Sequence, residues 1–449
     1  MSPDVLILGG GIAGLTVAAT LLRGGCEPLV LEQASRLGGA ISTHEENGFL
    51  PEEGPNSLML ENDGTENFLR QLGLIPLEAN SSAQKRFLVC HGQVTPAPTN
   101  PFSALTTPLL SLPGKLRILL EPFAANAATG TEESVAAFAR RRLGAEVVPR
   151  LIDPMVAGVF AGDPEKLSLR HALPRLHEME QTYGSLLRAG LAKRRAAPNR
   201  RIVNFPRGMR EMPDAMARFI GPQRISLSTE ILRLECIADG WAISWRHEGK
   251  IRRARARALV IAIPPRQWQD LPLPAGLLRY LRPWHALPAP PVTVLSLGFR
   301  REQVRHPLDG FGMLVPACER RHILGTLFPS SLFPGRAPEG HVLLTSFLGG
   351  CRQPEVTNLT PEDQQELALG ELSSLLEISG KPCFSRIRAW PRAIPQYNIG
   401  YGRLAALLDE AERDCSHLYF CGNYRGGISV PKTIRNALSS AEKILAALR

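Results

Sequence analysis

The chain has 449 residues, 44% hydrophobic and 21% charged, a composition typical of a globular protein and not of a disordered one. A chain of this length exceeds one ordinary core, so we expect two or three substructures. Lys and Arg outnumber Asp and Glu by 52 to 42, but basic runs such as RRR at 140–142 and RRARAR at 252–257 lack interleaved aromatic residues, which argues against nucleic-acid binding.

The cysteines and the apolar stretches exclude further classes of protein. The 8 cysteines are scattered, with no Cys-x-x-Cys pair and no His/Cys cluster at ligand spacing, so neither a disulfide framework nor a metal site is expected. No stretch of about 18 apolar residues is free of charge and proline, and the first apolar run lacks a basic leader. We therefore expect a cytoplasmic protein without a membrane-spanning helix.

The chain opens with the pattern of a βαβ unit. An apolar run at 4–9 is typical of a buried parallel strand, 12–24 has the pattern of a helix, and PLVLE at 28–32 predicts the second strand.

The turn between the first strand and the helix carries a glycine fingerprint. Gly9, Gly11 and Gly14 allow, in turn, a tight bend, a close approach of backbone to a diphosphate, and tight packing of helix on strand. The diphosphate then lies at the N-terminus of the helix, beside Ile12 and Ala13, where unpaired N–H groups favour negative charge. The turn predicts dinucleotide binding.

The residues after the second strand favour FAD over NAD. Glu32 is placed for the hydroxyl groups of a ribose, and Gln33 follows it. Arg36 then adds a fixed cation, and Gly38 and Gly39 permit a second close approach of backbone. This extension resembles the dinucleotide motif of flavin oxidases.

The remaining elements are split by two long insertions. Strand patterns return at 224–265, and a strand, turn and helix pattern closes the chain at 418–448. The insertion at about 76–203 is mostly helical in pattern, whereas that at about 266–385 contains the strand-like runs VTVLSLGFR and VLLTSFLGG.

Two later segments extend the predicted cofactor site. In LYFCGNYRGG, Gly422 and Asn423 follow a strand and precede a helix, which repeats the anion-binding arrangement. In STEIL at 228–232, Ile231 is placed like the strand residue that reaches the adenine in flavin oxidases.

A set of ordered motifs makes the resemblance specific. The motifs are EEGPNS (52–57), KRFLV (85–89), ESVAAFARRRLG (133–144), LIDPMVAGVFAGDPEKLSL (151–169), GFGMLVP (310–316), LGTLFPSSLFPGRAP (324–338), TSFLGG (345–350) and WPRAIPQYNIGY (390–401). Together they resemble the protoporphyrinogen oxidase family of oxygen-dependent flavoenzymes over nearly the whole chain, and the plant and Gram-negative type more than the mammalian one. The segment GNYRGGISVPKTI departs from relatives near Arg425 and Lys432.

The resemblance implies an α/β (α+β overall) fold with three parts. A Rossmann-like FAD-binding domain is assembled from discontinuous segments, beside a β-rich substrate domain and a helical insertion. The implied ranges are 1–75, 204–265 and 386–449 for the FAD-binding domain, 76–100 and 266–385 for the substrate domain, and 101–203 for the helical, membrane-associated domain.

The resemblance also assigns residues to the substrate. Arg86 matches an arginine that pairs with a propionate, Leu314 and Leu327 a pair that sandwiches one pyrrole, and Phe347 an aromatic residue that stacks on another. Without the resemblance, the last three would be read as strand core and Arg86 as a surface residue. Further implied cofactor contacts are Gly54, Pro55, Asn56, Ser57, Trp390 and Val430. No residue has a strong claim to be a catalytic acid or base.

The expected activity is the oxidation of protoporphyrinogen IX to protoporphyrin IX. It takes three hydride transfers to flavin N5, with oxygen reduced to hydrogen peroxide. The expected partners are the porphyrinogen, molecular oxygen, a membrane surface, a downstream chelatase and a second copy in a homodimer. The location implied is the inner face of the cell membrane, contacted by the apolar stretch 102–123 with Lys115 and Arg117. The same stretch could instead pack inside the helical domain or line the substrate entrance.

Three alternatives stay open at the level of the sequence. The same flavin chemistry could act on coproporphyrinogen III, whose four propionates would use the excess of positive charge. An amine oxidase or carotene desaturase shares the FAD fingerprint, although CGNY around Cys421 does not resemble a covalent flavin attachment site. A regulatory module that binds NAD or FAD without catalysis is the third.

Overall fold

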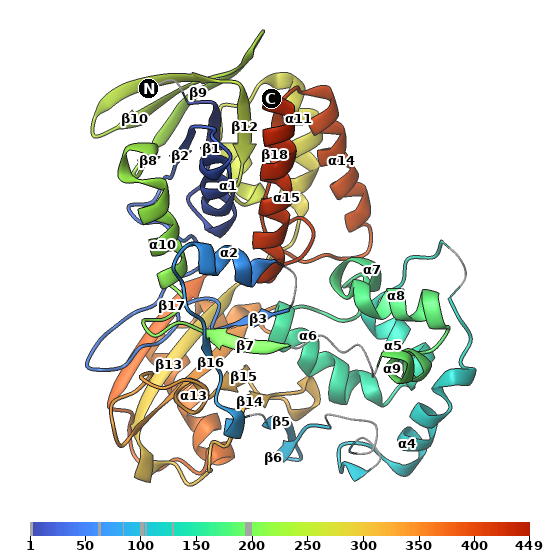
Figure 1. Cartoon of the computed structure of the whole chain (residues 1–449). Helices are drawn as coiled ribbons and strands as arrows, with labels where there is room; N and C mark the ends of the chain where they lie inside the picture. The colour runs from blue at the N-terminus through green and yellow to red at the C-terminus, as the bar shows by residue number, and fades with distance from the viewer. Residues whose placement is uncertain are drawn as a thin grey trace.

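Two sheets, one parallel and one mixed, organise the protein, with a group of helices beside the second (Figure 1). The computed structural model describes residues 3–61, 64–83, 85–98, 103, 106–127, 130–193 and 200–449.

The five-stranded sheet draws its strands from three distant parts of the chain and is parallel throughout. This confirms the predicted assembly of a nucleotide-binding fold from N-terminal, middle and C-terminal segments. In spatial order the strands are β18 (Leu418–Phe420), β12 (Ala258–Ile261), β1 (Val5–Leu8), β2 (Pro28–Leu31) and β8 (Ile225–Ser226).

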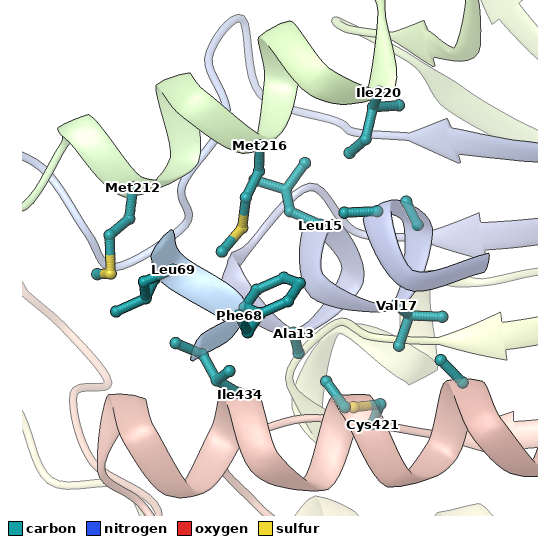
Figure 2. Close-up of a cluster of buried hydrophobic side chains, with 14 of the residues drawn as sticks. Ala13, Leu15, Val17, Phe68, Leu69, Met212, Met216, Ile220, Cys421 and Ile434 are labelled. Atoms are coloured by element: carbon teal, nitrogen blue, oxygen red, sulfur yellow. The ribbon is translucent and has the colours of Figure 1, made fainter. Parts of the chain in front are cut away.

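The apolar residues of this sheet alternate between its two faces, so each face packs against other elements of the protein. Val5 and Ile7 of β1 point into a cluster formed with four helices (Figure 2), whereas Leu6 and Leu8 point into a second cluster on the opposite face. The four helices are α1 (Ile12–Arg23), α2 (Thr65–Gln71), α10 (Glu211–Ile220) and α15 (Val430–Leu448). The opposite face packs against β9 (Glu230–Ile237), β10 (Gly240–His247), β11 (Lys250–Ala256), α11 (Ala275–Leu281) and α14 (Tyr401–Asp414).

The seven-stranded sheet is antiparallel except where β14 pairs with β5. In spatial order its strands are β17 (Phe384–Trp390), β13 (Val292–Arg300), β16 (His341–Gly349), β15 (Ile323–Leu327), β14 (Gly310–Leu314), β5 (Lys85–Cys90) and β6 (Gln93–Pro96). One face packs on α13 (Pro361–Leu376), through residues such as Phe87, Leu295 and Met313. The short helix α12 (Pro329–Leu332) follows β15.

A small sheet lies between the five-stranded and the seven-stranded sheet (Figure 1). It consists of β3 (Leu58–Leu60), β7 (Arg201–Asn204) and β4 (Leu77–Glu78). The border expected between 385 and 386 falls inside β17, which hydrogen-bonds to β13 along its length. The other domain limits stay predictions.

The helical group forms between β6 and β7. Its helices are α4 (Leu112–Leu119), α5 (Val135–Leu143), α6 (Asp153–Phe160), α7 (Leu169–Ala172), α8 (Pro174–Tyr183) and α9 (Leu186–Lys193). No helix among the described residues is long and apolar enough to span a bilayer.

Part of the basic run 140–142 is buried and structural. Arg142 is completely buried and its Nη2 lies 2.7 Å from Oε1 of Glu121, which is equally buried. Arg141, which is only partly buried, pairs with the buried Glu180 at 2.7 Å. These arginines therefore hold the helical group together and do not present their charge to a partner.

We predict that Arg142→Ala lowers the free energy of unfolding by about 3–5 kcal/mol, because it leaves the buried carboxylate of Glu121 without its cation. The matched control is Arg140→Ala, which removes an exposed ion pair with Glu165 and should cost less than about 1 kcal/mol. Urea unfolding followed by circular dichroism measures both. Equal effects of the two substitutions would contradict the structural role of Arg142.

Candidate functional site: a dinucleotide turn beside an apolar sheet face

The glycine turn between β1 and α1 has the geometry that the sequence predicts. A Cβ on Gly14 would lie 2.0 Å from the carbonyl oxygen of Gly9, so helix and strand could not approach each other as they do. Gly9 adopts φ +110°, a conformation that residues with a side chain rarely adopt. A Cβ on Gly11, in contrast, would meet only Gly39 Cα, at 4.0 Å.

The N-terminus of α1 is open toward a ligand. Gly11 is the N-cap and offers no side-chain hydrogen bond, and the first turn of the helix contains no acidic residue. The N–H groups of Ile12 and Ala13 precede the first helical hydrogen bond, which Leu15 donates to the carbonyl of Gly11. The dipole and N–H groups here favour an anion.

The residues after β2 stabilise this turn through hydrogen bonds. Oε2 of Glu32 accepts a hydrogen bond from Gly10 N–H at 2.6 Å, and its Oε1 accepts one from Ala34 N–H at 2.8 Å. Each carboxylate oxygen can accept a second bond, so a role toward a ribose is compatible with this geometry. Gln33 is exposed beside it.

Arg36 acts on its own loop in this structure. Its guanidinium donates to the backbone carbonyls of Leu37, Gly39 and Ile41, at 3.1, 2.8 and 3.2 Å. Gly38 N–H donates to the carbonyl of Gly10 at 2.8 Å, which ties the two glycine segments together. Arg36 thus stabilises the conformation of its loop, and its positive charge lies close to the glycine turn.

The loop 52–57 continues this chain of contacts. A Cβ on Gly54 would lie 2.0 Å from the carbonyl oxygen of Ala40, so the two segments touch through backbone. Trp390 at the end of β17 donates from Nε1 to the carbonyl of Glu53 at 2.6 Å. The structure therefore brings together residues that the sequence places far apart.

Two polar groups of this loop are buried. Burial raises the pKa of Glu52 to about 6, although its carboxylate accepts hydrogen bonds from Thr43, Met209 N–H and Asn204. Oδ1 of Asn56 is buried without a hydrogen-bond partner among the described residues. An unpaired buried acceptor of this kind is costly unless a bound group donates to it. Pro55 and Ser57 flank Asn56 and are half-buried.

The segment before β9 lies beside Glu32. Thr229 N–H donates to the carbonyl of Glu32 at 3.0 Å, and Ser228 N–H donates to that of Ala34 at 3.0 Å. Ile231 follows two residues later, half-buried and opposite Trp245 of β10. This placement agrees with a contact to the adenine, which stays a prediction.

Two stacked tyrosines hold the C-terminal turn. The rings of Tyr397 and Tyr401 lie 4.2 Å apart, and their hydroxyls donate to the carbonyls of Asn423 and Tyr424, each at 2.6 Å. Gly422 is buried against the ring of Tyr424. Sequence reasoning assigned no role to either tyrosine, although both lie in the motif WPRAIPQYNIGY.

The rest of this turn is fixed to its surroundings. Arg425 pairs with Glu412 of α14 at 2.6 Å, which fixes the turn to this helix. Val430 begins α15 and packs into the core on the α1 side of the sheet. Burial raises the pKa of Cys421 to about 12, so its thiol is a core group and a poor nucleophile.

These observations fit a dinucleotide along the turn, because the open N-terminus of α1, the space at Gly11 and the unpaired Asn56 lie on connected segments. The contacts of the individual residues with a cofactor stay predictions.

The four predicted substrate residues share one face of the seven-stranded sheet. Residues paired across neighbouring strands point to the same side. Leu314 pairs with Gly325, and Gly325 pairs with Phe347. Two residues further along β14, Gly312 pairs with Arg86 on one side and with Leu327 on the other. Leu314, Leu327 and Phe347 are only half-buried in strands that are otherwise almost completely buried.

The helix α6 covers part of this face. A Cβ on Gly158 would lie 2.4 Å from Cδ2 of Leu314, so the helix and the sheet are in contact there. Further along, a cavity of about 10 Å³ is lined by Leu327 together with Asn56 and Ser57 of the cofactor loop. The predicted substrate wall and the predicted cofactor loop therefore adjoin.

Comparisons with known proteins agree with this arrangement. The model of the family of flavin-containing amine oxidoreductases matches residues 12–445. The chain belongs to this family. It is thus an FAD-dependent oxidoreductase, which confirms the predicted cofactor and excludes a non-catalytic module.

Two curated relatives cover nearly the whole chain of this flavoprotein. It is 30% identical over 480 residues to protoporphyrinogen oxidase 2, chloroplastic/mitochondrial, of Arabidopsis thaliana, covering 99% of this chain and 94% of the relative. It is 25% identical over 454 residues to the coproporphyrinogen III oxidase of Bacillus subtilis, covering 96% and 95%. The resemblance indicated by the ordered motifs is confirmed.

Solved structures support the fold of the flavoprotein. A crystal structure from Exiguobacterium sp. 255-15 matches with a TM-score of 0.84 at 22% identity, covering 99% of both chains. Cyclohexylamine oxidase from Brevibacterium oxydans IH-35A matches with a TM-score of 0.69 at 18% identity, covering 100% of both.

We predict that Gly11→Val yields a folded protein without FAD, since the new side chain has room in the polypeptide but fills the position of the diphosphate. Gly14→Ala, the matched substitution three residues away, should instead destabilise the protein, because its Cβ meets a carbonyl oxygen. Flavin absorbance per protein and the thermal unfolding midpoint separate the two effects. Full flavin content in Gly11→Val would contradict the placement of the diphosphate.

Proposed function

We propose that the protein oxidises protoporphyrinogen IX to protoporphyrin IX, in three two-electron steps, with oxygen reduced to hydrogen peroxide. The observation that carries the proposal is the shared sheet face of Arg86, Leu314, Leu327 and Phe347, in a chain whose relatives are named for porphyrinogen oxidation. A porphyrinogen is a large apolar ring with carboxylate arms, and this face combines apolar side chains with a cation.

Bound FAD supplies the hydride acceptor that no protein side chain provides. The chain's own residues position the substrate. Leu314 is held between α6 and the sheet, and Leu327 and Phe347 present half-buried apolar surface on the same side. Such surfaces exclude water from the ring and fix its plane, which brings one carbon within reach of the oxidant. We assign no catalytic acid or base.

Arg86 is the residue suited to bind a propionate. Its guanidinium lies 5.7 Å from the centre of the Phe311 ring, and no ion pair within the described part of the chain includes it. Its neighbour Lys85, in contrast, is paired with Asp309. An exposed arginine without a partner beside an apolar wall can bind a carboxylate through two hydrogen bonds.

Coproporphyrinogen III is a second candidate substrate. The Bacillus subtilis relative is named for it, and the excess of 10 positive charges suits a ligand with four carboxylates. The oxidation itself would be the same.

We further propose that the protein binds the inner face of the cell membrane through α4 and the turn after it. Leu112, Leu116, Leu119, Leu120 and Phe123 are between 49% and 82% exposed, and their spacing places them along one side of the segment. Residues 102, 104 and 105 of the predicted stretch lie outside the described residues. α4 lies at the periphery of the helical group (Figure 1).

Arg117, one of the two basic residues named in this stretch, forms hydrogen bonds within the protein. Arg117 donates to the backbone carbonyls of Arg141 and Arg142, at 2.6 and 3.1 Å, so it anchors α4 to α5 and is not directed to lipid. Apolar insertion is therefore the main contribution to the proposed membrane contact. A chelatase that receives the product and a homodimer stay proposals without a structural argument.

We predict that Arg86→Ala raises KM for protoporphyrinogen IX about tenfold or more, as expected for the loss of hydrogen bonds to a charged group, with flavin content unchanged. Lys85→Ala is the control, since the lysine already has a partner, and its KM should stay near that of the wild type. Steady-state kinetics with porphyrin fluorescence measures both. An unchanged KM in Arg86→Ala would contradict the carboxylate contact.

We predict that the protein sediments with liposomes that contain anionic lipid, and that the double substitution Leu116→Asp, Phe123→Asp abolishes sedimentation while activity toward dissolved substrate persists. A charge inserted into the apolar side of an interfacial helix opposes its burial in lipid. Ile75→Asp, which removes an equally exposed apolar residue outside the helical group, should leave sedimentation unchanged. Wild-type protein that stays in the supernatant at low salt would refute the proposal.

A further inference from the structure

Arg388 on the edge strand β17 lies on the same sheet face as the proposed substrate residues. It pairs with Val294 of β13, and Val294 pairs with Phe347 of β16. Leu314, Gly325, Phe347, Val294 and Arg388 thus form one continuous row across the sheet. The apolar wall of the substrate face therefore ends in a guanidinium at this edge.

Arg388 forms no ion pair within the described part of the protein, although its charge is felt by the carboxylate of Glu53. Its Nε is buried without a hydrogen bond, and its guanidinium carbon lies 4.7 Å from the centre of the Trp390 ring. The ring is fixed in turn, because Trp390 donates to the carbonyl of Glu53. A guanidinium held in place and partly desolvated, yet unpaired, is costly unless an anion occupies the site.

Arg386, two residues earlier on the same strand, differs from Arg388 because it forms an ion pair. Arg386 binds the carboxylate of Glu53 at 2.8 Å and ties β17 to the cofactor loop. Burial is outweighed by hydrogen bonds from Ser42 and Arg386 and by the charges of Arg386 and Arg388, which lower the pKa of Glu53, so this carboxylate is charged and its hydrogen bonds go to Ser42 and Arg386. Arg388 is left available for a ligand.

Arg86 and Arg388 are unpaired cations at opposite sides of one apolar wall. Their strands, β5 and β17, are separated by the four strands between them. At about 4.8 Å for each strand spacing, this places their backbones roughly 24 Å apart along the sheet. A small anion cannot contact both arginines; a ligand that does must be wide, apolar in the middle and anionic at opposite edges.

We propose that Arg388 is a second carboxylate-binding residue of the substrate site, which holds an arm on the edge of the tetrapyrrole opposite to the arm held by Arg86. This inference rests on the proposed function. Protoporphyrinogen IX carries its two propionates on one side of the ring, whereas coproporphyrinogen III carries propionates on both. Arg388 therefore determines how well the site accepts tetracarboxylate tetrapyrroles.

Binding of two oxidised porphyrins to the FAD-loaded protein tests the role of Arg388 without turnover. Coproporphyrin III has carboxylates on both sides of the ring, and mesoporphyrin IX has them on one side only. We expect Arg388→Gln to raise Kd for coproporphyrin III about tenfold or more and Kd for mesoporphyrin IX by less than about twofold, because only the first loses a charged hydrogen bond. Porphyrin fluorescence anisotropy gives both constants.

Three controls make the result specific. Arg388→Lys keeps the charge and should recover part of the affinity for coproporphyrin III. Arg392→Gln removes an exposed arginine two residues after Trp390 and should change neither constant. The flavin absorbance of Arg388→Gln should equal that of the wild type.

Equal changes in both constants, no change in either, or loss of flavin from Arg388→Gln would overturn the role of Arg388 while the proposed function stands. Wild-type protein that binds neither porphyrin would overturn the proposed function, and this inference with it.

Discussion

The close approach of Gly9 and Gly14 is the constraint on which the rest of the site depends. With 2.0 Å between the carbonyl of Gly9 and the position of a Cβ on Gly14, the helix α1 can start only if residue 14 has no side chain. The N-terminus of α1, with its unpaired N–H groups, therefore faces the space at Gly11. The segment around Gly39 then contacts this turn through backbone, and Gly54 in turn contacts the carbonyl of Ala40 next to Gly39. The cofactor site is thus built outward from one contact between two glycines.

The proposed substrate face lies on one side of the seven-stranded sheet, and the core lies on the other. The side with Phe87, Leu295 and Met313 packs against α13 as an ordinary core. The opposite side carries half-buried apolar residues and the unpaired guanidinium groups of Arg86 and Arg388. Since every other residue of a strand points to the same side, the two roles can be combined in the same strands.

Local patterns could predict the cofactor end of the molecule, because its signals lie close together in sequence. Gly-x-Gly-x-x-Gly, Glu32 and the Gly38-Gly39 pair are all within the first 39 residues. The proposed substrate face could be put forward only through the resemblance, since Leu314 and Phe347 are indistinguishable from strand core until the register of β14, β15 and β16 is known. The sequence also gives no sign of the proposed role of Arg388 or of the stacked pair Tyr397 and Tyr401, because both depend on contacts that only the folded chain makes.

The central claim is that this flavoprotein converts a porphyrinogen to a porphyrin at the face of the seven-stranded sheet. Aerobic incubation of the purified, FAD-loaded protein with protoporphyrinogen IX, with porphyrin fluorescence and peroxide followed together, tests it most directly. We expect fluorescence to rise well above the uncatalysed rate and about three molecules of peroxide to form for each porphyrin, as three two-electron steps require. Fluorescence that rises no faster than in a protein-free control, with protoporphyrinogen IX and with coproporphyrinogen III alike, would contradict it.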